Sequence, residues 1–99
     1  MHSFEVAAVT PGRFVAKVRD GLAERGYDRH VGVRLAGDRL TVEFRWMGTS
    51  CFVYSVTETD RGFRADLVDQ SVAPLHTPFA DRFEGYFNKA LEELGARTV

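Results

Sequence analysis

Several stretches of the chain alternate apolar and polar residues, the period of two that is typical of a β-strand with one buried face. In the first stretch, Phe4 and Val6 alternate with Glu5 and Ala7. The later stretches are separated by the turn-forming segments AGDR, GTS and TDRG. They lie at about residues 30–36, 39–47, 51–59 and 63–69. The pattern predicts one N-terminal strand and an antiparallel meander of four more.

Two other stretches have the spacing of three to four residues that is typical of an amphipathic helix. Each opens on Thr-Pro, at residues 10–11 and 77–78, because threonine caps a helix and proline fits its first turn. Gly26 and Gly95 mark the expected ends. At Gly21 we expect close packing to offset the low helix propensity of glycine. The two apolar stripes consist of Phe14, Val15, Val18 and Leu22, and of Phe79, Phe83, Phe87, Ala90, Leu91 and Leu94.

The number of residues in each turn decides which side chains share a face of the sheet. Turns with an even number of residues around Gly37-Asp38 and Asp60-Arg61 bring the apolar residues of their flanking strands onto one face of the sheet. The pairs expected across these hairpins are Leu35–Leu40, Val33–Val42, Val31–Phe44, Val56–Ala65 and Tyr54–Leu67. A slip of one residue would expose this whole set, so we expect the register to be firmly specified.

The middle hairpin contains RWMGTSCF, residues 45–52, with the only tryptophan and the only cysteine of the chain. A two-residue turn would place Phe52 and Tyr54 on the polar face. We therefore expect a three-residue Gly-Thr-Ser loop, which pairs Trp46 with Phe52 and Phe44 with Tyr54. In this interpretation Trp46 and Phe52 close one end of the core, and Cys51 points outward.

The predicted elements run strand, helix, four strands, helix over one α+β domain, residues 1–99. We expect a curved antiparallel sheet of five strands with both helices packed on one face. This order is similar to the TBP-like arrangement and to a shortened helix-grip fold of the kind found in hydrophobic-ligand binders. The similarity lies in element order alone, so by itself it says little about function.

Composition narrows the classes of partner. The chain has 99 residues, 44% of them hydrophobic, and its 13 Lys and Arg against 14 Asp and Glu give a net charge of -1. No overall field would attract nucleic acid or a membrane surface, and no apolar run is long enough to cross a bilayer. One cysteine and three histidines on separate elements suggest no disulfide, metal site or cofactor. We expect a protein of a reducing, bacterial-type cytoplasm.

The first functional hypothesis is a non-enzymatic binding domain that holds a small, largely apolar ligand between the sheet and the second helix. Register places Asp69 on the apolar face opposite Phe52, where aromatic walls and one charge would suit a ligand with a polar end. The expected lining residues are Trp46, Phe52, Tyr54, Asp69, Phe83 and Phe87.

The alternative is a homodimeric interaction module that uses the outer sheet face or an edge strand. Its expected interface is the outward apolar corner of Met47, Cys51, Val53 and Val68. Catalysis ranks third, because the chain contains no nucleophile or nucleotide-binding motif. Asp69, Tyr54 and His76 are the only catalytic cluster that the pattern offers, and we name no catalytic residue.

Overall fold

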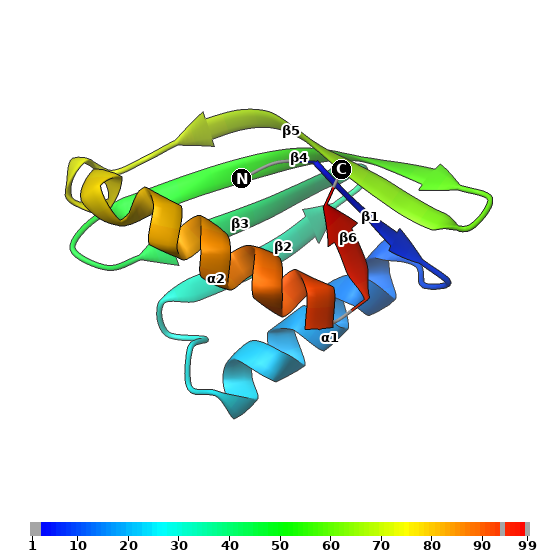
Figure 1. Ribbon diagram of the computed structural model, residues 1–99, viewed down its shortest axis with the longest axis horizontal. Helices are drawn as coiled ribbons and strands as arrows, with labels where there is room; N and C mark the ends of the chain where they lie inside the picture. The colour runs from blue at the N-terminus through cyan, green and yellow to red at the C-terminus, as the bar shows by residue number, and fades with distance from the viewer. Residues whose placement is uncertain (1–2, 94, 99) are drawn as a thin grey trace.

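The computed structural model describes residues 3–93 and 95–98, which form an α+β domain with a curled antiparallel sheet and two helices (Figure 1). The chain order includes a short 3₁₀ helix, η1, directly before the second α-helix. The elements are β1 (Phe4–Ala7), α1 (Pro11–Glu24), β2 (Val31–Ala36), β3 (Arg39–Arg45), β4 (Thr49–Thr59), β5 (Gly62–Ser71), η1 (Pro74–Phe79), α2 (Ala80–Glu93) and β6 (Ala96–Thr98).

The sheet has six strands, in the order β2-β3-β4-β5-β1-β6, so the expectation of five strands was wrong. The additional strand, β6, follows α2 and pairs antiparallel with β1, with Ala96 opposite Val6. Sequence reasoning missed it because a strand of three residues is too short to display a period. β6 brings the end of the chain against its beginning, and Ala96 joins the core.

Helix α1 confirms the predicted start. The Thr10 hydroxyl accepts a hydrogen bond from the Arg13 backbone N–H at 3.3 Å, and Pro11 opens the first turn. After the helix, Gly26 adopts a φ of 73°, which suits glycine at a helix end. The expected close packing at Gly21 was wrong, because a Cβ there would meet nothing within 4 Å.

The core lies on the concave side of the sheet, where both helices are found (Figure 1). Its centre is aromatic: the Phe4 ring centroid lies 5.3 Å from that of Tyr54 and 5.9 Å from that of Phe14. Phe14 in turn lies 5.4 Å from Phe63, so helix α1 is joined to β1 and β5 through ring contacts. The buried apolar residues are Phe4, Val6, Phe14, Val15, Val18, Val33, Leu40, Val42, Phe44, Tyr54, Phe63, Ala65, Leu91 and Ala96.

The register of the first hairpin is confirmed, with Val33 opposite Val42. The register of the third hairpin is confirmed from its turn as far as Tyr54, which lies opposite Leu67. In the middle hairpin the predicted pairs were wrong, because Phe52 lies opposite Val42 and Phe44 lies opposite Ser50. The paired residues Arg45 and Thr49 enclose a three-residue turn of Trp46, Met47 and Gly48.

Like the predicted loop, this turn contains an odd number of residues. Phe52 and Tyr54 therefore keep their predicted face, although the turn lies at residues 46–48 instead of 48–50. The Trp46 N–H donates to the Gly48 carbonyl at 2.9 Å. Met47 has a φ of 51° and Gly48 a φ of 131°. A glycine readily takes such an angle at the end of a three-residue hairpin loop, which explains why Gly48 closes the turn rather than opening it.

The start of the second helix also differs from the prediction. Thr77 and Pro78 lie inside η1, and α2 begins at Ala80. The segment of residues 70–76, for which the sequence predicted no structure, contributes the end of β5 and the start of η1. Because η1 continues into α2 without an intervening loop, the positions of the two are tied together.

Candidate functional site

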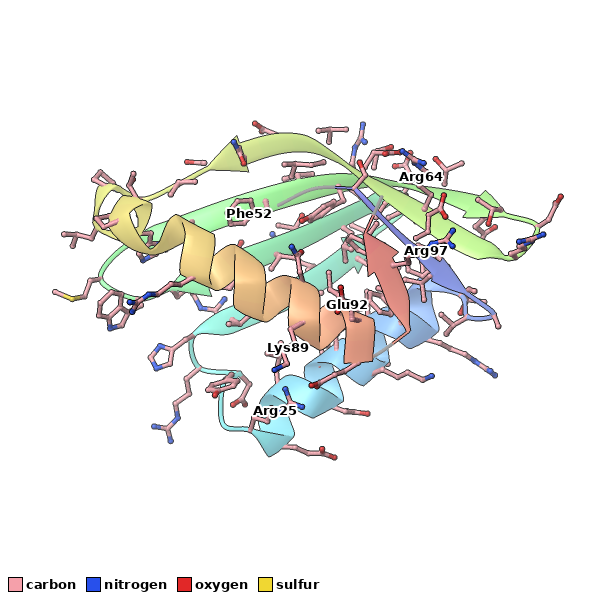
Figure 2. The ribbon with its side chains drawn as sticks, viewed as in Figure 1. Arg25, Phe52, Arg64, Lys89, Glu92 and Arg97 are labelled. Carbon is pink, nitrogen blue, oxygen red and sulfur yellow. The ribbon has the colours of Figure 1, made fainter. Side chains whose placement is uncertain are left out.

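The expected ligand-lining residues of the sheet separate in the structure. Tyr54 is completely buried in the aromatic core, and Phe52 is half-buried with its ring centroid 5.8 Å from that of Phe44. Figure 2 shows Phe52 on the side of the sheet that α2 crosses. Trp46 does not lie on the inner face of the sheet, because it belongs to the β3–β4 turn, where it is 46% exposed. The side chains of Phe83 and Phe87, on α2, lie outside the described part of the structure.

The expectation that Asp69 faces inward, opposite Phe52, was wrong. A β-bulge shifts the register between Val53 and Tyr54, so that Asp69 lies opposite Val53 and Gln70 opposite Phe52. One extra residue in a strand reverses the face of every residue beyond it. Asp69 is therefore exposed on the outer side of the sheet.

The bulge also separates the expected catalytic cluster. Asp69 is exposed on the outer face, Tyr54 is inside the aromatic core, and His76 is buried against β4 through Ser50. The structure does not bring these three side chains together at one site.

The expected interface residues lie in two places. Cys51, Val53 and Val68 belong to the outer side of β4 and β5, with Val68 53% exposed and the other two half-buried. Met47 is 69% exposed, but it projects from the hairpin turn. The pKa of the Cys51 thiol is raised, first by desolvation and then by the charge of Glu43. A thiol with a raised pKa is a poor nucleophile at neutral pH, which argues against a reactive cysteine.

His76, from η1, is a buried polar residue that contacts the β3–β4 turn and β4 through both of its ring nitrogens. It is 2% exposed, and its Nδ1 lies 2.5 Å from Ser50 Oγ while its Nε2 lies 2.5 Å from the Trp46 carbonyl oxygen. The imidazole also stacks on the Trp46 indole, with centroids 6.3 Å apart and planes at 15°. The Ala73 N–H donates to Ser50 Oγ at 2.9 Å. Together these contacts join the β3–β4 turn, β4 and η1.

The chemistry of the donor and acceptor atoms decides the direction of each hydrogen bond around His76. A carbonyl oxygen can only accept, so His76 Nε2 carries the hydrogen that is donated to Trp46. In the neutral ring Nδ1 then accepts the Ser50 hydroxyl hydrogen, while Ser50 Oγ accepts from Ala73. A serine beside a histidine can act as a nucleophile and its base, but Ser50 and His76 are each 2% exposed. The arrangement serves to hold chain segments together.

The hydrogen bonds of Ser50 and His76 hold the β3–β4 turn against η1 at one end of the molecule (Figure 1), and both segments carry exposed apolar residues. Trp46 and Met47 come from the turn, and Val72 and Leu75 flank the η1 start. A Cβ on Gly48 would lie 3.1 Å from Ala73 Cβ, so the two segments are in contact. Their exposures are 46%, 69%, 37% and 53% for Trp46, Met47, Val72 and Leu75. We call these four residues the contact patch.

Sequence reasoning missed Ser50, Val72 and Leu75 as members of this region. The predicted Gly-Thr-Ser loop placed Ser50 in a turn, whereas the observed pairing puts it in β4, inward and opposite Phe44. The sequence contains no signal that separates this turn from the predicted one, because both contain three residues and both include Gly48.

An open hollow of about 370 Å³ lies at the β4–β5 hairpin and the start of α1. Its rim carries charges of both signs, including Arg13, Arg61, Glu58 and Asp60. At the start of α1 the Arg13 N–H donates to the Thr10 hydroxyl, and the Ala8 N–H donates to the Arg61 carbonyl oxygen at 2.5 Å. The hollow therefore has the features of an ordinary junction between two loops.

Comparison with known proteins gives no assignment: no family model, curated protein or solved structure matches the chain. Among the residues that the structure describes, no group of three or more His, Cys, Asp or Glu is arranged to hold a metal ion. Over the same residues, no helix has the length and apolar character needed to cross a membrane.

Proposed function

We propose that this chain is a non-enzymatic interaction domain that binds a second copy of itself through the contact patch. The observation that carries the proposal is that the two segments bearing Trp46 and Met47 and bearing Val72 and Leu75 are in contact, and that all four side chains are partly exposed. Exposed apolar side chains that cluster mark interaction surfaces more often than single ones do. Tryptophan in particular is enriched among residues that dominate binding energy.

The charge pattern of the contact patch is compatible with a second copy of the chain as the partner. A two-fold axis packs a surface against itself, so a self-complementary surface must not bring like charges together. The four residues of the contact patch are uncharged, and the adjacent Arg45 is paired with Glu43 at 3.4 Å. The patch can therefore meet its own copy without an unpaired charge at its centre.

The size of the contact patch indicates a weak dimer. The exposed fractions run from 37% to 69%, so even at the roughly 150–250 Å² of an aromatic side chain the four residues would together present only about 300–500 Å². A standard interface buries about 800 Å² on each partner. Even with surrounding polar residues, we expect an association that appears only at high protein concentration.

Sedimentation velocity over a wide concentration range tests this proposal, with Leu75→Arg as the disrupting variant. Losing a central apolar contact and introducing a charge should cost about 2 kcal/mol, or roughly thirtyfold in the dimer dissociation constant. Val68→Arg is a matched control, since Val68 and Leu75 are both 53% exposed but Val68 lies on the outer face.

The two variants distinguish the contact patch from the outer-face interface expected from the sequence. If Val68→Arg or Val53→Arg abolishes association and Leu75→Arg does not, the outer face is the interface. A wild-type protein that stays monomeric at the highest attainable concentration would refute self-association altogether.

An apolar ligand between the sheet and α2 is the second candidate function. One observation favours it: Phe52, Val56 and Leu67 lie on the concave side of the sheet yet are only half-buried. Apolar side chains that keep some exposure on the inner face are typical of binding-pocket walls. Native mass spectrometry and ligand-observed NMR with fatty and aromatic compounds test this function, and the absence of any bound species would exclude it.

A further inference from the structure

We propose that His76 is a latch that couples the position of helix α2 to the shape of the contact patch. This inference rests on the proposed function, because it concerns how the patch is assembled. It starts from the fact that the patch is made by two separate segments, the β3–β4 turn and the residues around the start of η1.

The hydrogen bonds of the latch form one directional series, from Ala73 N–H to Ser50, from Ser50 to His76, and from His76 to the Trp46 carbonyl oxygen. Ser50 and His76 are buried, so breaking one link leaves a buried polar group without its bond. Such a loss costs far more than breaking the same bond at the surface. The series therefore opens as a unit rather than bond by bond.

The latch lies at one end of α2, and a second attachment lies at the other end. His76 belongs to η1, which runs directly into α2. Near the far end of the helix, Leu91 is 5% exposed in the core together with Ala96 of β6. Arg25, at the end of α1, reaches Glu93 at 3.0 Å, and Figure 2 shows Arg25 below this end of the helix. A movement of α2 away from the sheet consequently pulls on His76.

The turn that carries Trp46 has a reason to change when the latch opens. Met47 is held at a φ of 51°, a left-handed conformation that a residue other than glycine adopts at a cost. The Trp46–His76 stacking and the contact of Gly48 with Ala73 oppose its relaxation. When these contacts are lost, Trp46 and Met47 separate from Val72 and Leu75, and the contact patch is divided. The binding surface is then complete only while α2 is seated.

The fluorescence of Trp46 reports whether the latch is closed, because Trp46 is the only tryptophan of the chain. Its quenching by acrylamide is measured at a dilution where the protein is monomeric. Leu91→Ala loosens the far attachment of α2 and is expected to raise the quenching constant, by up to roughly twofold because Trp46 is already 46% exposed. Val18→Ala, which removes core packing from α1 rather than α2, is the matched control and is expected to leave the constant unchanged.

The coupling is tested by combining these changes with substitutions of His76. His76→Ala should raise quenching by itself, and Leu91→Ala should then add nothing, because the two ends are no longer connected. His76→Gln keeps one donor and one acceptor and should restore most of the coupling. Additive effects of His76→Ala and Leu91→Ala, or an equal response to Val18→Ala, would overturn the proposal.

A second variant covers the case in which Leu91→Ala does not fold. Gly85→Ala stabilises α2, since a Cβ there would meet nothing within 4 Å, and it should lower the quenching constant in the presence of His76 but not in His76→Ala. An identical response in the two backgrounds would contradict the latch. All these readings come from the monomer, so a failure to dimerise would refute the proposed function without affecting them.

Discussion

Replacing Gly62 with alanine is the sharpest test of how closely β1 approaches β5. Gly62 opens β5 and lies opposite Ala7 of β1. A Cβ at this position would lie within 3 Å of three backbone atoms, the Ala7 Cα and the carbonyl carbon and oxygen of Val6. Backbone atoms cannot turn aside as a flexible side chain can, so β1 must shift away from β5.

The expected cost follows from what β1 contributes to the core. Its residues Phe4 and Val6 are 3% and 2% exposed, and Val6 lies opposite Phe63, which is 1% exposed. Overpacking a tight core site costs about 1–3 kcal/mol, and the rigid backbone here places Gly62→Ala near the upper limit, at about 3 kcal/mol. At about 4–8 °C per kcal/mol for a domain of this size, the melting temperature should fall by roughly 12–24 °C.

Urea denaturation followed by circular dichroism measures the loss directly, and a thermal melt provides the second value. Gly85→Ala serves as the control, because the same added methyl group meets open space there. If Gly62→Ala unfolds within about 0.5 kcal/mol of the wild type, a change typical of a neutral surface site, β1 does not approach β5 as described.

Three further predictions concern single side chains. Gly21→Ala and Gly85→Ala should each raise the free energy of unfolding by about 0.5–1 kcal/mol in urea titrations, because both helix positions have room for a methyl group, and a decrease would show unseen crowding. Cys51 should react with iodoacetamide at neutral pH more slowly than an unfolded peptide thiol, because desolvation and Glu43 raise its pKa above the ordinary 9.0, and a faster reaction would contradict this. Hydrogen bonds from Ser3 and Arg64 hold the pKa of Asp66 below its ordinary 3.8. The stability that these bonds provide is therefore present above pH 3.8 and is lost as the pH falls through the lower pKa of the folded state. The urea midpoints of Asp66→Asn and the wild type should converge in acid, and a gap that widens would refute the assignment.

The alternation of apolar residues was sufficient to predict most of the fold. It placed the strands of the meander, the helix that begins at Pro11 and two of the three hairpin registers, because these features depend on neighbours that are close in sequence. The Thr10 cap and Pro11 are local signals of the same kind, and the structure confirms them.

The middle hairpin shows where local reasoning reaches its limit. Parity predicted correctly that Phe52 and Tyr54 share a face, but parity cannot distinguish a turn at residues 48–50 from one at 46–48. The difference moves Trp46 out of the core and Ser50 into it. Only the contacts of the turn with Ala73 and His76, more than twenty residues away in the chain, decide between the two.

The sequence by itself determined which face of each helix and strand is apolar. It also determined how adjacent strands pair next to turns that contain an even number of residues. The tertiary structure alone decided that a bulge turns Asp69 outward, that β6 completes the sheet beside β1, and that His76 joins η1 to the turn that carries Trp46. These features depend on contacts between distant segments, and such contacts form only where the chain has already been folded back on itself. A single sequence carries no local period that records them.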